Sequence, residues 1–94
     1  MVILFHLIIF PIEFKITVDI NGFIHSINDN PSVHFYNGGG GTKWWFKHGR
    51  KHRLTGPARI NIELGTNEYW IEGIQFTQEE FETYINRMEL LNEF

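Results

Sequence analysis

The segment from Trp44 to Ala58, which reads WWFKHGRKHRLTGPA, gathers the residue types best suited to binding a ligand. An exposed indole beside cations suits a phosphorylated base, because the ring stacks on the base while the cations meet phosphate oxygens. The same pairing suits an acidic protein surface, where Trp and Arg are frequent hot spots. We therefore predict a site that binds either a protein or a nucleotide, built from Trp44, Lys47, His48, Arg50, Lys51 and Arg53.

The charge of the chain is unevenly distributed. The net charge is -3, yet residues 43–59 hold six of the eight Lys and Arg residues and no acid. Residues 60–94 hold Arg87 as their one Lys or Arg, against eight Glu. A basic island on an acidic protein can attract an anionic partner, because the local field matters more than the total charge. The alternative is that the acidic C-terminal segment packs beside the island and neutralises it.

Catalysis is not predicted. His25, His34, His48 and His52 could supply acid–base chemistry, but no spacing fixes them against a nucleophile or a carboxylate. His48 and His52 are four apart across a turn, and no His/carboxylate spacing of a metal site recurs. The chain has no cysteine, which excludes disulfides and thiolate metal sites. We predict no catalytic residue, no metal and no cofactor.

Alternating hydrophobicity predicts the strands that must position these residues. Apolar side chains alternate with polar ones from Ile12 to Ile20, and Asn21-Gly22 then reads as a tight turn with positive φ at both positions. The run Asn37 to Thr42 contains four glycines and leads into a strand, so we predict a flexible hairpin loop and no phosphate loop. Further strands are predicted at residues 23–26, 33–36, 44–47, 50–53, 59–64 and 68–71, the fifth with Ile60, Ile62 and Leu64 buried.

The C-terminal segment predicts an amphipathic helix. Thr77 and Glu80 have the spacing of a capping box, and Phe76 and Phe81 have that of a hydrophobic staple. A stripe that packs on the sheet is predicted for Phe81, Tyr84, Ile85, Met88 and Leu91.

The N-terminal run MVILFHLIIF is too short for a spanning helix, which needs about 20 residues, and it lacks the features of a secretory signal. Its branched and aromatic residues predict a strand. We expect the C-terminal helix or a second copy of the chain to cover it, since an exposed strand of this kind would aggregate. This favours a homodimer and no membrane association.

The chain also repeats itself. Asn21 to Ser32 matches His48 to Ala58, with Gly and His three apart in both copies, and a truncated third copy starts at Glu72-Gly73. We predict stacked hairpins in which His52 ties one hairpin to the next through a bond to the backbone. Trp45 and Trp70 are predicted to be core, and Trp44 to point the other way.

Residues 45–58, Trp70 to Gly73 and Thr77 to Phe81 resemble the short repeat proteins of bacteriophages and giant viruses. Their units read roughly Trp-x-x-x-Gly-x-x-His-Arg-x-x-Gly-Pro-Ala, and they are distantly similar to membrane occupation and recognition nexus repeats. The first unit departs from this pattern, with Ser26 in place of Arg and Asn30 in place of Gly. The resemblance implies a sheet of hairpins, a viral origin and a binding role.

We therefore expect a mainly β fold of the α+β type: an antiparallel sheet of repeated hairpins with one C-terminal helix. A single domain would comprise strands in 1–20, hairpin repeats in 21–76 and a helix in 77–93. The expected function is a non-enzymatic viral binding protein in the host cytoplasm that inhibits a host defence factor. A protein that sequesters a signalling nucleotide is the alternative; a nucleic-acid-binding or virion structural protein is a further one.

Overall fold

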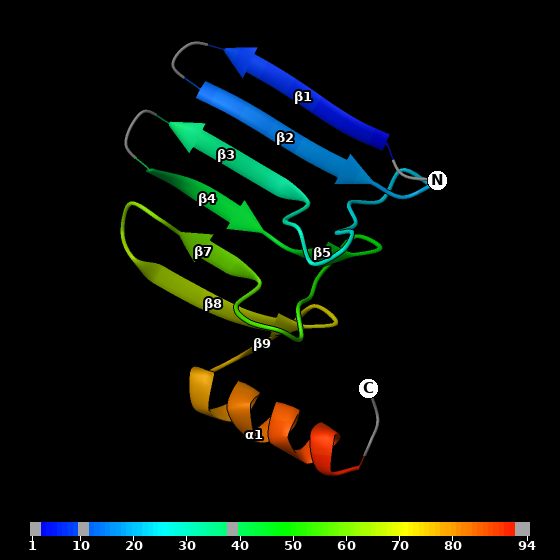
Figure 1. Cartoon of the computed structure of the whole chain (residues 1–94), viewed down its shortest axis with the longest axis vertical. Coiled ribbons are helices and arrows are strands. Elements are labelled where there is room, and N and C mark those ends of the chain that lie inside the picture. The colour runs from blue at the N-terminus through cyan, green and yellow to red at the C-terminus, as the bar shows by residue number, and fades with distance from the viewer. Residues whose placement is uncertain (1–2, 10–11, 38–39, 92–94) are drawn as a thin grey trace.

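The computed structural model describes residues 3–9, 12–37 and 40–91, and it has the mainly β architecture expected (Figure 1). A seven-stranded antiparallel sheet has the order β1-β2-β3-β4-β7-β8-β9, and β5 and β6 form a separate two-stranded sheet. The strands are β1 (Ile3–Ile9), β2 (Ile12–Val18), β3 (Val33–Asn37), β4 (Gly40–Trp44), β5 (Phe46–Lys47), β6 (Arg50–Lys51), β7 (Arg59–Asn61), β8 (Thr66–Ile71) and β9 (Ile74–Phe76). One helix, α1 (Gln78–Leu90), follows the last strand.

The sheet is thin and its core is small. The molecule measures 46 × 33 × 18 Å, and its accessible surface of 6402 Å² exceeds the roughly 5,700 Å² typical of an 11.1 kDa monomer. The buried hydrophobic residues of the described chain are Val18, Trp45, Ala58, Ile71 and Phe81. No second layer of secondary structure covers β2, β3 and β4 among the described residues, so part of their apolar surface stays accessible (Figure 1).

The hydrogen bonds between successive units confirm the internal repeat. His25 N–H donates to Thr17 O, and His52 N–H donates to Trp45 O in the same way. Three backbone bonds between the first and second units have counterparts between the second and third. The bonds Ser26 N–Phe46 O, Ser32 N–Trp44 O and Gly49 N–Ile24 O correspond to Arg53 N–Trp70 O, Ala58 N–Glu68 O and Gly73 N–Lys51 O. The two sequence copies therefore occupy equivalent places in a stack of hairpins.

The helix begins as predicted but does not lie across the whole sheet. Thr77 and Glu80 form the capping box, with Glu80 N–H donating to Thr77 Oγ1 and Thr77 N–H to Glu80 Oε1. α1 packs beside β8 and β9, at the opposite end of the sheet from β1 (Figure 1). It therefore does not cover the apolar N-terminal strand. This helix is neither long nor apolar enough to cross a membrane, and the described residues hold no other.

The predicted helix stripe is correct except at its end. Phe81 is buried against the Tyr69 ring, with ring centroids 4.8 Å apart, and Phe76 meets Tyr84 at 5.7 Å. Leu91 is 59% exposed and is the C-cap residue, which follows the last helical residue, Leu90.

Several predicted strands are shorter in the structure. Residues 23–26 contribute one isolated bridge, Val18 to Ile24. His25 N–H still bonds to Thr17 O, but Ser26 N–H bonds to Phe46 O of the following unit, so the pairing with β2 does not continue. The predicted strand 44–47 is interrupted at Trp45, 50–53 is reduced to β6, and 59–64 ends at Asn61. There Gly65 N–H and Leu64 N–H bond to Asn61 and close a turn. Ile62 and Leu64 are consequently exposed, contrary to the prediction of a buried face.

Two turn predictions also need correction. Positive φ at both central residues occurs at His48-Gly49 and Glu72-Gly73, whereas in the first turn only Gly22 has it. The Asp19 side chain explains the difference, since its Oδ1 accepts from Asn21 N–H and Phe23 N–H and sets another turn geometry. The glycine run is not wholly a loop: Gly40 and Gly41 are part of β4, while 38–39 lie outside the described residues.

Candidate functional site

Two tryptophans from different strands lie on one face of the sheet. Trp44 on β4 is paired in register with Val33 on one side and Arg59 on the other, and Arg59 is paired with Glu68 on β8. Trp70 follows Glu68 by two positions, so it shares that strand face. Both indoles are half-buried. We call the group Trp44, Phe46, Lys51, Arg59 and Trp70 the tryptophan face.

Lys51 joins the two indoles. Its Nζ lies 4.8 Å from the Trp44 ring centroid and 4.3 Å from that of Trp70, which is within the range of a cation–π contact. The Arg59 guanidinium lies 5.0 Å from the Trp44 ring and makes a 2.7 Å ion pair with Glu68. Trp70 Nε1 donates to the other Glu68 oxygen at 2.9 Å. Trp70 is thus part of a partly exposed polar and aromatic cluster and is not the core residue predicted.

Trp45 points away from this face and is part of the core, as predicted. It is 4% exposed, and its Nε1 donates to Asp29 O at 3.0 Å. The Arg53 guanidinium stacks over its ring at 3.7 Å and donates to both Asp29 carboxylate oxygens, at 3.0 and 3.2 Å. Arg53 also donates to Pro57 O, and Thr55 donates to Asp29. The bond from Arg53 is the main reason why the pKa of Asp29 lies below its usual value.

The predicted site residues therefore separate into groups. Trp44 and Lys51 meet on the tryptophan face, whereas Arg53 stacks on Trp45 on the other side. Lys47 makes a 2.9 Å ion pair with Glu72, and His48 Nδ1 lies 2.7 Å from Asp19 Oδ2. Arg50 is exposed at the start of β6, where its side chain passes close to Gly73.

The basic island is partly neutralised, but not by the helix. Its carboxylate partners are Glu72 for Lys47, Asp29 for Arg53 and Glu68 for Arg59, which all come from strands and turns. No ion pair joins an α1 carboxylate to the island among the described residues. Lys43, Arg50 and Lys51 form no ion pair within the part of the chain that the structure describes. These three cations keep the island positive.

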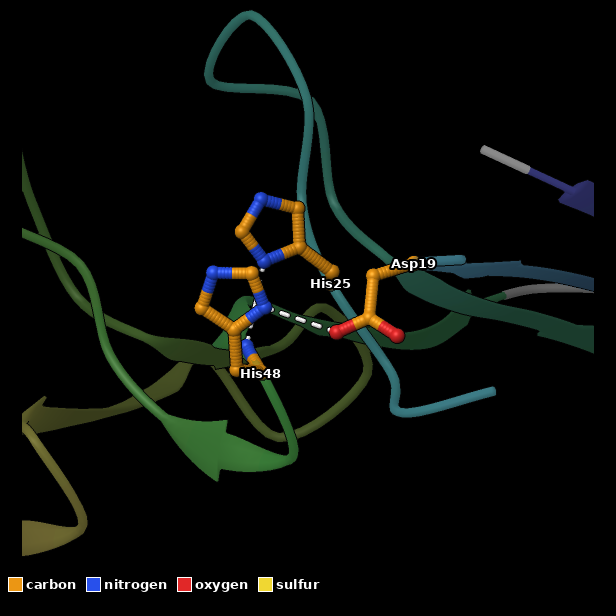
Figure 2. A group of neighbouring side chains, drawn as sticks. All are labelled: Asp19, His25 and His48. Carbon is orange, nitrogen blue, oxygen red and sulfur yellow. Dashed lines mark hydrogen bonds and ion pairs between the residues drawn. The ribbon is translucent and has the colours of Figure 1, made fainter. Parts of the chain in front are cut away.

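A second group, which the sequence did not suggest, lies where the first hairpin meets the second. Asp19, His25 and His48 come from three segments, and their nearest ligand atoms all lie within 4.8 Å of one another. Figure 2 shows the two imidazoles stacked, with 4.2 Å between centroids, and the Asp19 carboxylate turned toward the His48 ring. The bond to His48 is the main cause of a lowered pKa at Asp19; burial chiefly lowers the pKa of His25.

The same arrangement occurs once more along the stack with different residues. His25 Nδ1 accepts from His48 N–H at 3.1 Å, and His52 Nδ1 accepts from Glu72 N–H at 2.9 Å. This confirms that His52 ties two hairpins together through a bond to the backbone. The Asp19–His48 contact corresponds to Lys47–Glu72, with the carboxylate on the opposite hairpin. Each junction thus has one side-chain contact to a carboxylate and one histidine that accepts from the turn.

The His52 bond predicts a pH-dependent stability. Burial lowers the pKa of His52 from 6.5, and the neutral ring is the form that can accept from Glu72 N–H. The unfolded chain therefore binds more protons, and the stabilisation is complete above about pH 6.5 and is lost as the pH falls below it.

We expect the urea concentration at the unfolding midpoint of the wild type to be lower at about pH 5 than at about pH 7. The decrease should be smaller in His52→Gln, because glutamine keeps an acceptor but does not titrate. The measurement is urea unfolding at both pH values. An equal decrease in the wild type and the variant would contradict the assignment to His52.

The sequence did not indicate Asp19, His25, Arg59 or Glu68 as members of either group. The internal repeat could have indicated His25 and Asp19. When the two copies are aligned, each histidine falls beside the turn of the following hairpin, and Asp19 lies close to the same junction. For Arg59 and Glu68 no such signal existed, because their proximity depends on the register of β7 and β8.

No family model matches the chain, and no curated protein or solved structure matches it either.

Proposed function

We propose that this chain is a non-enzymatic binding protein that recognises an acidic surface of another protein through the tryptophan face. The observation that carries the proposal is Lys51, held between two half-exposed indoles without an ion-pair partner among the described residues. An ammonium group in this position offers a carboxylate a fixed charge, and the indoles supply apolar area around it. Such combinations of aromatic anchors and cations are typical of protein interfaces.

The open sheet supports the same proposal. The chain exposes more surface than a compact monomer of its mass, and β2 and β3 continue the tryptophan face with apolar side chains such as Ile16 and Val33. These side chains are only half-buried. A partner that covers this face would bury area that the chain leaves accessible.

A nucleotide is the less favoured ligand for this face. A base would stack on a free indole surface, but Lys51 and Arg59 already lie over the Trp44 ring, and Lys51 lies over Trp70. Stacking would require these cations to move away and lose their contacts. An acidic protein surface needs no such rearrangement, because it meets the cations where they are.

A binding role also agrees with the use of the titratable residues. His25, His52, Asp29 and Asp19 all make bonds that hold the hairpins together. The resemblance to viral repeat proteins gives the proposal its biological form: an inhibitor of a host defence factor, acting in the host cytoplasm. The apolar sequence of β1, at the edge of the sheet, supports homodimer formation as part of this proposal.

The test compares two charge reversals in pull-downs from host lysate followed by affinity measurement on the recovered protein. Lys51→Glu removes the cation of the tryptophan face, and we expect affinity to fall at least about tenfold because a central charge pair is reversed. Lys43→Glu is the matched control, since Lys43 alternates with Trp44 along β4 and lies on the other face. It should bind like the wild type.

Equal binding of the wild type and Lys51→Glu would overturn the proposal. A shift in the melting temperature with cyclic or ADP-ribose-type nucleotides, lost in Trp44→Ala, would instead favour sequestration of a signalling nucleotide. Affinity for DNA or RNA that declines steeply with salt would favour the nucleic-acid alternative.

A further inference from the structure

We propose that Asp19, His25 and His48 form a binding site for a zinc ion at the junction between the first and second hairpins. Two imidazole nitrogens and one carboxylate oxygen are a ligand set that Zn²⁺ accepts, with a fourth position left for water. Mg²⁺ and Ca²⁺ prefer sites made entirely of oxygen ligands, which this one is not. The site is separate from the tryptophan face and does not depend on its function.

The distances between the ligand atoms lie on both sides of the separation found in a zinc site. The three ligand atoms lie within 4.8 Å of one another, and His48 Nδ1 and Asp19 Oδ2 are 2.7 Å apart. Tetrahedral bonds of about 2.0–2.1 Å would place the ligand atoms roughly 3.3 Å apart. The ligand atoms must therefore shift, and the His48 ring must turn out of its stack on His25 so that both imidazoles can face the ion. The His48 side chain is 62% exposed, which leaves it room to turn (Figure 2).

Asp19 is oriented in advance for this role. Its side chain is 9% exposed, and Oδ1 accepts from Asn21 N–H at 2.8 Å and Phe23 N–H at 3.0 Å. These bonds hold the carboxylate so that Oδ2 points toward the histidines, as bonds to the outer atoms of a ligand do in known metal sites. The ion would replace the direct Asp19–His48 contact and compete with the bond from His48 N–H to His25 Nδ1.

The next junction provides a comparison inside the same molecule. There the equivalent residues are Lys47, His52 and Glu72. A lysine ammonium has no lone pair to offer, so that junction presents only two ligands. We therefore assign zinc to the first junction alone, where it would clamp two hairpins of a chain with a small core.

The experiment is calorimetric titration of ZnCl₂ into the untagged protein near pH 7, together with amide chemical shifts of the ¹⁵N-labelled chain. We expect one ion per chain, with shift changes centred on residues 19, 25 and 48. His48→Lys is the informative variant, because a lysine there can still pair with Asp19 but cannot bind zinc. Its affinity should fall at least about tenfold, since even outer partners of metal ligands contribute 10- to 100-fold.

His52→Gln is the matched control and should bind zinc within about twofold of the wild type, since the second junction presents too few ligands. No saturable binding by the folded wild type would overturn the proposal. So would shift changes centred on His34 or the N-terminus, or a His48→Lys variant of wild-type affinity.

Discussion

Trp45→Ala should be among the most destabilising single substitutions in the protein. Trp45 is 4% exposed, and replacing a buried tryptophan with alanine costs about 3–5 kcal/mol in free energy of unfolding. The substitution also leaves Asp29 O without its donor and removes the surface on which Arg53 stacks. Because a domain of this size is stable by only about 5–15 kcal/mol, the variant should be close to unfolding at room temperature.

The neighbouring Trp44→Ala is the control. Trp44 has the same side chain and the adjacent position, but it is half-buried and makes cation–π contacts with Lys51 and Arg59. Its loss should cost about 1–2 kcal/mol. The loss of stability in both variants can be measured by urea unfolding. The unfolding is followed by far-UV circular dichroism, because each variant lacks one of the tryptophans whose fluorescence would otherwise report on it. Equal losses would show that the two tryptophans are not divided between core and surface.

The fold was predicted most accurately where the sequence signal involved residues close together in the chain. The capping box of Thr77 and Glu80 was correct because it involves residues three apart. The strand predicted from Ile12 to Ile20 was correct as far as Val18, because alternation of side chains is a local property, but Ile20 is 72% exposed and Asp19 is buried. Ile62 and Leu64 continued the alternation of β7, yet they are exposed. There the Asn61 side chain and Gly65 close a turn that overrides the pattern.

The candidate site was only partly predictable for a related reason. Trp44 and Lys51 were identified because they lie in one basic segment, but Trp70 and Arg59 reach them only through the pairing of β4, β7 and β8. Arg53 was indistinguishable in sequence from Lys51. Its stacking on Trp45 and its pairing with Asp29 depend on a loop 24 residues earlier in the chain. The sequence shows where the cationic residues are, but not which of them already form ion pairs or stack on a ring within the chain.

Gly41→Ala should be strongly destabilising. Gly41 is buried in β4 with a φ of 144°, a conformation that side-chain-bearing residues rarely adopt. A Cβ there would meet the Phe35 carbonyl oxygen closer than any real contact allows, and Phe35 C and Tyr36 Cα at 3.2 Å. β3 cannot move away easily, because it is hydrogen-bonded between β2 and β4. Overpacking and backbone strain together should cost roughly 3 kcal/mol or more.

Gly65→Ala separates the two causes. Gly65 has a φ of 66°, but a Cβ there meets nothing within 4 Å, so only the conformational cost of roughly 1–2 kcal/mol applies. The difference between the two variants in urea unfolding then measures the close approach of β3 to β4. Similar losses of stability in the two variants would mean that β3 can move away from the new Cβ with little loss of free energy, as a flexible loop can. A larger loss of stability for Gly41→Ala would mean that β3 and β4 leave no room for a side chain at this position. The run of four glycines in the sequence does not show which of them is required for this reason.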